Sequence, residues 1–305
     1  QLMNLDEVQV HFNPNQLFVL NAALSFLMFG VALEIKLDDF KKVFQYPKIS
    51  LVALTCQYIL FPLLTLLIIY TCHPATSVAM GLILVSACPS GNMANYMTHH
   101  AKANVALSVT LNSVIVLLAF IMTPLVYGFW SQFVPDAAVF NQNIHIDPMQ
   151  IVKIIFNLIL IPLCLGIGVT RFFPTVTPKI KPYISIASLV IFFGCIAGAL
   201  INNWAIVSGY FWQFFFIVLL HNSLALLMGY WFARLNRLEE TDCRTISIES
   251  GIHNTALGLI LIFQFFNGIG GMAVIAAWWG IWDLIAVFGL ASWWRGRESK
   301  RESIV

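Results

Sequence analysis

Charged residues are scarce in this sequence. Only 10% of its 305 residues are Asp, Glu, Lys or Arg, whereas 59% are hydrophobic. Soluble domains carry about 25% charged residues, so the composition excludes an ordinary soluble domain and predicts an integral membrane protein. The formal net charge is only +2. We expect the chain to interact with the lipid bilayer, and we do not expect it to bind nucleic acid.

The sequence also lacks the motifs of several other protein classes. Its six cysteines are scattered, mostly inside apolar runs, without the paired spacing of a disulfide framework or a zinc site. It has no His-Glu-x-x-His metal motif and no Gly-x-Ser-x-Gly nucleophile elbow. Residues 1–12 are polar and lack the basic start of a cleavable signal peptide. We therefore do not expect an enzyme, and we expect no cleaved leader.

Long apolar runs fill most of the chain. They are long enough for the ~20 residues that a helix needs to cross a bilayer, and they lack the alternation of membrane β-strands. We predict an all-α membrane protein of nine transmembrane helices, which occupies residues 1–305 as one polytopic domain. The predicted segments are Gln16–Glu34, Pro47–Tyr70, Ala75–Ala101, Asn104–Trp130, Met149–Phe173, Tyr183–Ile201, Ala205–Ala233, Thr245–Phe266 and Met272–Trp294.

The positive charges test this helix count. When the connectors are assigned alternately to the two sides, 15 of the 16 Lys and Arg fall on one side, and Lys153 is the exception. Basic residues concentrate in cytoplasmic loops. The distribution predicts a multi-pass protein of the cell (inner) membrane, with the N-terminus outside and residues 295–305 as a cytoplasmic tail.

Two polar stretches interrupt the apolar pattern, at Ala87–Thr98 and Ile246–Gly258. Each contains a Ser-Gly pair, Ser90-Gly91 and Ser250-Gly251, followed by Asn residues. We interpret them as two interrupted helices that face each other inside the membrane. They are the third of four helices in residues 16–130 and the fourth of five in residues 149–294. Two inverted repeats, the first without its first helix, would give this order, which is a recurrent plan of secondary transporters.

Glu249 is the most informative residue of the second stretch. A carboxylate in an apolar segment is costly unless it is paired, protonated or bound to a cation. One interpretation is that Glu249 faces water beside Arg244. The other is that it binds a cation together with other polar side chains of the apolar runs. The candidate side chains are Gln57, Asn95, Ser108 and Asn112. Individually, such residues in membrane helices more often form hydrogen bonds between helices.

Further polar groups point to a substrate. Half-helices that begin after the two Ser-Gly pairs would direct free N–H groups inward, which favours an anion, although each pair could simply be a kink. His253 is either a neutral hydrogen-bonding group or a proton carrier. Asp283, inside the last apolar run, either lines a pocket or pairs with a polar neighbour.

At these residues the chain resembles the bile acid:sodium symporter family, as a bacterial-type, nine-helix member. The resemblance covers most of the chain, and it rests on Gly30–Phe40, Ile83–Asn95, Asn104–Ser108 and Ile248–Asn254. It implies a core domain with two crossed, interrupted helices and a panel domain formed by the other helices. It also implies sodium as the bound ion, with one site formed by Asn95, Ser108, Asn112 and Glu249 and another by Gln57, Glu249 and His253.

The chain departs from the family pattern at some of these positions. Ala94 lacks the usual side-chain oxygen, and Asn112 replaces a hydroxyl residue. His253 stands where Gln is frequent, which raises a proton as an alternative to the second sodium. Asp283 stands where bile-acid-type members are uncharged, which argues against a bulky sterol anion.

We therefore predict a sodium-coupled symporter of an organic anion that works by alternating access. We expect the small-molecule anion to contact Asn92, Met93, Asn254 and Asp283. Three alternatives stay open: a metalloid exporter related to arsenite exporters, because Cys88 precedes the first break; a proton-coupled anion transporter that uses His253; and a sensor that binds without transport. The sequence makes no prediction of oligomeric state.

Overall fold

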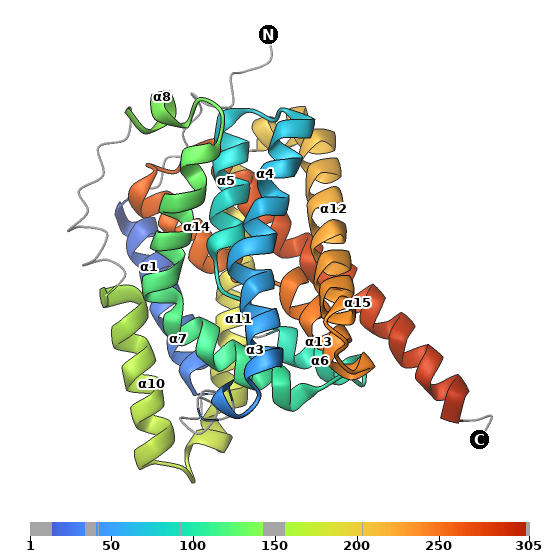
Figure 1. Ribbon diagram of the computed structural model, residues 1–305. Helices are drawn as coiled ribbons and strands as arrows, with labels where there is room; N and C mark the ends of the chain where they lie inside the picture. Colours follow the sequence, from blue (N-terminus) through green and yellow to red (C-terminus); the bar gives the residue numbers. More distant parts are fainter. Residues whose placement is uncertain are drawn as a thin grey trace.

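The computed structural model describes residues 14–33, 41, 43–91, 93–142, 156–202 and 204–302. Within these ranges every regular element is a helix, so the prediction of an all-α protein is confirmed (Figure 1). Asn92, most of the predicted connector after the first apolar run, and the start of the fifth run lie outside the described residues.

Several predicted runs form one helix made of more than one type of turn. Pro47–Thr55 (α3) continues through a π-helical segment, Cys56–Leu60, into Phe61–Cys72 (α4). A second π-helical segment, Phe156–Leu160, leads into α10. The other helices are α1 (Pro14–Ala32), α5 (Thr76–Ala87), α6 (Met93–His100), α7 (Val105–Trp130), α8 (Ala137–Gln142), α10 (Ile161–Phe172), α11 (Thr177–Asn202), α12 (Trp204–Leu235), α13 (Glu240–Gly251), α14 (Thr255–Phe265) and α15 (Gly270–Glu302).

Four continuous helical stretches are long and apolar enough to cross a membrane. They span Pro47–Cys72, Val105–Phe133, Ser208–Leu235 and Gly270–Arg297. Shorter apolar helices include the halves Thr76–Ala87 and Thr255–Phe265. The chain is therefore a multi-pass membrane protein, and the count of nine crossings stays a prediction. The residues after Trp294, predicted as a tail, continue α15 as far as Glu302; they contain no Pro, and Arg, Glu and Lys favour helix.

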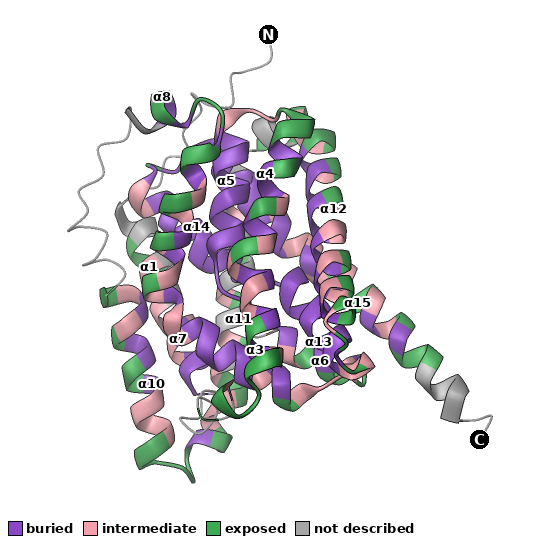
Figure 2. Cartoon of the chain, in the orientation of Figure 1, coloured by how far each residue is buried: buried purple, intermediate pink, exposed green. Residues whose placement is uncertain are grey.

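The helices pack in two groups. α1 contacts α10 and α11, whereas α12, α13 and α15 pack among α4, α5, α6, α7 and α14. Figure 2 shows the buried residues concentrated in the inner helices of the second group. α5 and α14 are buried on nearly all sides, as their uniformly apolar sequences require. Large apolar side chains such as Leu67 and Leu125 are exposed on the outside, where a bilayer would cover them.

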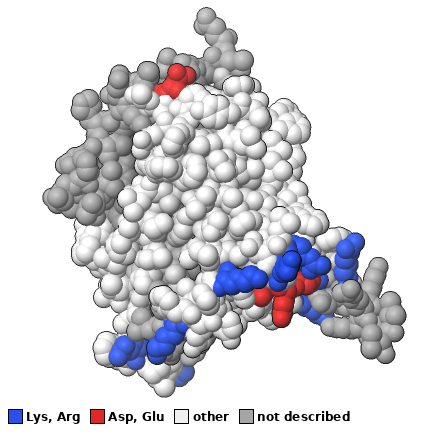
Figure 3. All heavy atoms as spheres, viewed as in Figure 1, with Lys and Arg blue, Asp and Glu red and all other residues white. Residues whose placement is uncertain are grey.

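Close helix contacts depend on small residues. At Gly81 of α5, an added Cβ would lie 2.5 Å from Ile275 and 2.9 Å from the Cα of Met272. Such contacts let α5 and α15 approach closely, which is typical of helix packing in membranes. The charged surface is polarised as well, because on the face shown in Figure 3 the Lys and Arg side chains gather at one end.

Candidate functional site

The first interruption lies between α5 and α6. α5 ends at Ala87, and Cys88 adopts an extended conformation with ψ of 148°. This follows from Pro89, which has no N–H to donate and disfavours helical geometry in the residue before it. α6 begins at Met93. The first predicted break is therefore present, and it starts two residues before Ser90-Gly91.

The second interruption differs from its prediction. α13 continues through Ser250 and Gly251, and the Ser250 hydroxyl donates to the Ile246 carbonyl at 2.8 Å. The chain becomes extended at Ile252, and α14 begins at Thr255. Asn254 caps α14, because its Oδ1 accepts the Leu257 N–H at 3.1 Å. The Ser-Gly pair thus forms the last turn of a helix, and the break follows the pair directly, at Ile252, instead of lying at the pair as predicted.

The two interruptions pair with each other. The Asn254 N–H donates to the Pro89 carbonyl at 2.8 Å, and the Gly91 N–H donates to the Ile252 carbonyl at 3.4 Å. Ser90 and His253 form an antiparallel bridge between these bonds. In Figure 1, α5 and α14 lie in the upper half of the molecule and α6 and α13 in the lower half. The two broken helices therefore cross, and each satisfies backbone groups that the other leaves free.

Three side-chain amides from neighbouring helices hold the remaining backbone of the crossing. Gln57, in the π-helical segment, donates to the Cys88 carbonyl at 2.8 Å. Asn112 of α7 donates to the Gly91 carbonyl at 3.1 Å, and Asn222 of α12 donates to the Gly251 carbonyl at 2.8 Å. Gln57 and Asn112 were predicted as ion ligands. In the structure their amide groups stabilise the backbone of the first interruption. Sequence reasoning missed Asn222, although His221-Asn222 is a conspicuous polar pair within an apolar run.

Beside the crossing, oxygen atoms from three helices converge. Glu249 of α13 accepts a hydrogen bond from the Ser108 hydroxyl of α7, and the same hydroxyl lies 2.8 Å from Asn95 Oδ1 of α6. Glu249 is only 4% exposed, so it does not face water; Arg244 instead pairs with Glu240, at 3.1 Å. Glu249 Oε2 and Asn112 Oδ1 are buried and have no hydrogen-bond partner among the described residues. The cluster therefore contains acceptor oxygens to which no described group donates a hydrogen bond.

His253 lies in an aromatic environment. Its ring centroid is 4.5 Å from that of Phe61 and 5.3 Å from that of Trp279. Neither ring nitrogen has a hydrogen-bond partner in the described part of the chain. Its backbone N–H donates to Asp283 Oδ2 at 3.3 Å, and Asp283 Oδ1 is buried without a described partner. The structure therefore brings Asp283 to the second break, where it supports the backbone.

His221 is a second buried histidine, which sequence reasoning missed. The Thr65 hydroxyl donates to the Phe61 carbonyl at 2.8 Å, so the His221 Nε2–H donates to Thr65 Oγ1, also at 2.8 Å. The Trp279 indole N–H donates to His221 Nδ1 at 3.0 Å. These partners assign a neutral ring with its proton on Nε2. The Phe61 ring lies between the two histidines, stacked on His221 with centroids 4.8 Å apart.

Two of the predicted substrate residues lie at the crossing, where the half-helices α6 and α14 begin. Met93 is the first residue of α6 and packs against the apolar cluster that contains Ile252 and Leu226. Asn254 precedes α14, and Asn92 lies outside the described residues. The described residues contain no group of three or more His, Cys, Asp or Glu that could hold a metal. Amide, hydroxyl and carboxylate oxygens, such as those around Glu249, instead suit a hard alkali cation.

Comparison with known proteins supplies the family. A family model described as "Sodium Bile acid symporter family" matches residues 21–210, a range that contains the first break, Gln57, Ser108 and Asn112. The chain belongs to this family. The match ends before Glu249 and the second break, so the pairing of the two breaks is independent of it.

Individual relatives extend the likeness along the chain. A Bacillus subtilis (strain 168) protein named "Uncharacterized sodium-dependent transporter YocS" is 29% identical over 283 residues, which cover 92% of this chain and 84% of that protein. "Probable sodium/metabolite cotransporter BASS2, chloroplastic" of Oryza sativa subsp. japonica is 28% identical, over 90% of this chain and 63% of its own length. The corresponding BASS1 protein of Arabidopsis thaliana is 30% identical, over 80% and 59%.

The chain thus spans about three fifths of the length of these two plant relatives. The relatives are named as transporters or cotransporters. The protein is accordingly a membrane protein of a transport family and not an enzyme.

Proposed function

We propose that the protein is a sodium-coupled symporter of an organic anion that works by alternating access. In this proposal the helices form nine crossings in two inverted repeats, residues 16–130 and 149–294. The second packing group acts as the core domain, and α1, α10 and α11 act as the panel. The basic end faces the cytoplasm of a cell (inner) membrane protein, because basic residues concentrate there, and the N-terminus lies outside.

One observation carries the proposal: the acceptor-rich cluster beside the paired breaks. Glu249, Ser108, Asn95 and Asn112 come from α13, α7 and α6, and two of their acceptor oxygens are buried without a described partner. A sodium ion at this cluster would offset the charge of Glu249. It would also join both broken helices to α7, so that binding stabilises one arrangement of the core.

A second sodium site would use Gln57, Glu249 and His253. Gln57 stands at the Cys88 carbonyl, and the imidazole nitrogens of His253 have no described partner. The same nitrogens favour a proton-coupled variant as the alternative. Uptake measured without sodium at several external pH values distinguishes the two, because a flat response excludes the proton. The exporter alternative gains no support, since the Cys88 side chain is fully buried (0% exposed).

The organic anion would bind where the half-helices begin. α6 starts at Met93, next to Asn92, and α14 starts after Asn254. Helix N-termini carry partial positive charge and free N–H groups. Because Asn254 Oδ1 is occupied by the Leu257 N–H, its Nδ2 is the atom that would donate to the anion. Asp283 at the second break would limit the size and charge of the substrate. Rocking of the core against the panel would then expose the site to the other side.

The proposal is tested with the purified protein in detergent. Thermal unfolding is measured with organic anions in sodium or choline buffer, since a ligand of the folded state raises stability by about 2.7 kcal/mol at a hundred times its Kd. We expect sodium alone to stabilise the protein, and the transported anion to add stability only with sodium. Glu249→Ala should abolish both effects. Asp136→Asn removes an exposed carboxylate and serves as the control; sodium stabilisation that persists in Glu249→Ala contradicts the proposal.

A further inference from the structure

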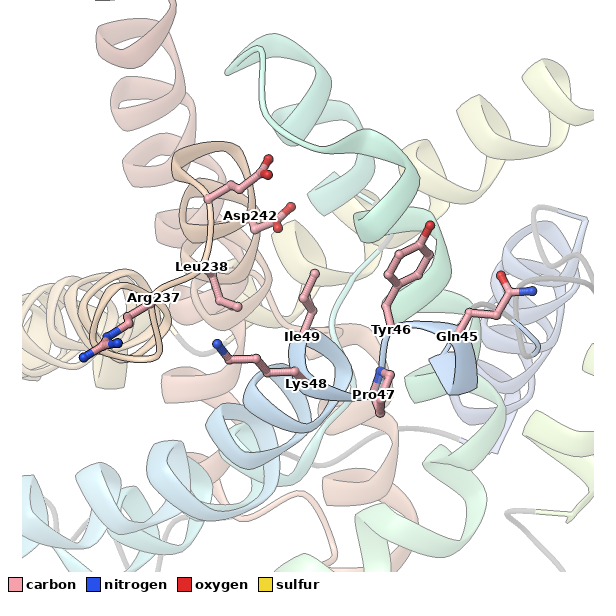
Figure 4. Close-up of a pocket in the computed structure, with 9 residues that line it drawn as sticks. Gln45, Tyr46, Pro47, Lys48, Ile49, Arg237, Leu238 and Asp242 are labelled. Atoms are coloured by element: carbon pink, nitrogen blue, oxygen red, sulfur yellow. The ribbon is translucent and has the colours of Figure 1, made fainter.

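A cavity outside the crossing lies at the basic end of the molecule. It has a volume of about 380 Å³ and opens between the start of α3 and the turn that joins α12 to α13. Its walls carry two cations and two carboxylates, besides Tyr46 and apolar residues; the charged residues are Lys48, Arg237, Glu239 and Asp242. In Figure 4, Lys48 projects from the start of α3, and Arg237 and Asp242 lie on the opposite side of the cavity, at the α12–α13 turn and in α13.

The local sequence sets this arrangement. Arg237 has a φ of 57°, in the left-handed region, and its N–H donates to the Arg234 carbonyl at 2.9 Å. This turn ends α12 and directs the chain into α13, where Glu239 is the N-cap. Tyr46 is the N-cap of α3, and Pro47 follows at the first helical position. Two helices therefore begin at the cavity.

The four charged groups are not satisfied by one another. Lys48, Arg237, Glu239 and Asp242 form no ion pair in the described part of the chain, where the ion pairs found are Glu240 with Arg234 and Arg244. Asp242 is only 5% exposed, and Oδ1 accepts one hydrogen bond, from Asn104 at 2.7 Å. A buried carboxylate that faces a charged cavity indicates a ligand with a group to offer it.

The charges are separated by sign. Lys48 lies in the first turn of α3, which has no acidic residue, so the free N–H groups of that turn add positive character. In Figure 4, the Lys48 side chain points toward the turn between α12 and α13, whereas the Arg237 guanidinium of that turn points away from Lys48. Opposite Lys48, Glu239 and Asp242 stand at the start of α13, where Glu240 adds a further carboxylate. This pattern fits a zwitterion, with an anionic group at Lys48 and an ammonium at Glu239 and Asp242.

The surroundings indicate where such a ligand comes from. Leu51, one helical turn after Lys48, is 67% exposed, and Leu235 at the end of α12 is 78% exposed. Ile49 and Leu238 make an apolar wall of the cavity itself. Lys and Arg side chains near a membrane surface attract lipid phosphates, and the two carboxylates of this cavity offer acceptors to an ammonium. We propose that the cavity binds the phosphoethanolamine headgroup of a phospholipid, with its acyl chains along α3.

The site is connected to the crossing. Asp242 and Glu249 lie two turns apart on α13. Asn104, the hydrogen-bond partner of Asp242, is the N-cap of α7 and precedes Ser108 by four residues. A headgroup at the cavity therefore stabilises the relative position of α7 and α13, the two helices that contribute Ser108 and Glu249.

Native mass spectrometry of the delipidated protein tests the proposal, independently of transport. Phosphatidylethanolamine, phosphatidylcholine and phosphatidylglycerol with identical acyl chains are titrated separately. We expect phosphatidylethanolamine to bind most tightly, because it alone offers both a phosphate and a primary ammonium. Lys48→Gln with Arg237→Gln should weaken this binding at least fivefold. Arg171→Gln with Lys179→Gln, which removes two exposed basic charges at α10 and α11, should change it less than twofold.

One further variant and two competition experiments identify which groups of the ligand the cavity recognises. Glu239→Gln, an exposed position, should reduce the preference for phosphatidylethanolamine over phosphatidylglycerol and leave the affinity for phosphatidylglycerol unchanged. Equal affinity for the three lipids, or an equal loss in the control pair, overturns the proposal. Soluble phosphoethanolamine should compete only weakly; competition as strong as that of the lipid would assign the cavity to a soluble ligand. Equally strong competition by inorganic phosphate would reduce it to a simple anion site.

Discussion

The Ser108 hydroxyl lies between two acceptors, Asn95 Oδ1 at 2.8 Å and the carboxylate of Glu249. A hydroxyl has one proton to donate, so with an ionised Glu249 one of these two contacts brings oxygens together without a hydrogen between them. Such a contact is costly in a buried, low-dielectric site. A cation beside the three oxygens, as proposed above, would remove this conflict.

Ser108→Ala removes one oxygen of the cluster. We expect the sodium affinity to fall about tenfold or more, because hydrogen bonds and contacts to charged groups contribute about 1.5–3 kcal/mol. The midpoint of sodium-dependent thermal stabilisation measures the affinity. Ser86→Ala is the matched control, since Ser86 is also buried but donates only to its own helix, at the Ile83 carbonyl. Equal midpoints for the two variants would show that the Ser108 hydroxyl is not a ligand.

The two buried histidines should respond differently to replacement by Phe. His221 has partners for both ring nitrogens, Thr65 and Trp279, whereas His253 has none among the described residues. His221→Phe leaves the Trp279 indole N–H without an acceptor, at a cost of about 1–3 kcal/mol. His253→Phe should cost less than 1 kcal/mol. Thermal unfolding without sodium makes the comparison, and a larger loss for His253→Phe would contradict it.

Asp283 supports the second break through one hydrogen bond, from the His253 N–H. Asp283→Asn keeps an acceptor oxygen and should preserve stability, whereas Asp283→Ala should lower it by about 1–3 kcal/mol. Uptake of the anion in proteoliposomes is measured alongside unfolding. If the charge of Asp283 selects the substrate, the Asn variant folds normally and has altered substrate preference. Unchanged unfolding in the Ala variant would exclude the structural role.

Gly229 of α12 allows α13 to approach. An added Cβ would lie 2.6 Å from Ser250 Oγ and 2.9 Å from the Ile246 carbonyl oxygen. Gly229→Ala must therefore displace α13, next to Glu249, and overpacking costs about 1–3 kcal/mol. We expect a lower unfolding temperature together with a weaker sodium response. Gly209→Ala, in the same helix, has nothing within 4 Å of the new methyl group and should be neutral; equal effects would argue against close packing as the cause.

The apolar runs predicted the apolar helices, though not α8 or the extension of α15 to Glu302. At the interruptions, Pro89 ends α5 and Asn254 begins α14. Glu249, Asn95 and Ser108 were recognisable because polar groups are costly in apolar segments, and the structure brings all three together. The family resemblance rests on segments that contain these residues, Ile83–Asn95, Asn104–Ser108 and Ile248–Asn254. These predictions succeed because desolvation penalises each such residue wherever it sits in the fold.

The sequence predicted that the two interrupted helices face each other, but not the individual contacts between distant segments. The Ser-Gly pair at Ser250-Gly251 indicated a break, but tertiary contacts allow α13 to continue through it. The network of His221, Thr65 and Trp279 joins three helices and leaves no periodic pattern in the sequence. The adjacent His221 and Asn222 are visible as polar residues in an apolar run, but the sequence does not reveal which carbonyl the Asn222 amide contacts.

The backbone pairing at the crossing also constrains how the protein is made. Gly91 and Asn254 obtain hydrogen-bond partners from segments about 160 residues away along the chain. At synthesis rates of roughly 5–20 residues per second, the first break therefore waits on the order of 10–30 s for its partner. During this interval its peptide groups need temporary shelter, from water, lipid headgroups or an insertion factor, because bare hydrocarbon cannot satisfy them. Assembly of the transport core is thus a late event in biogenesis, and it cannot be completed helix by helix.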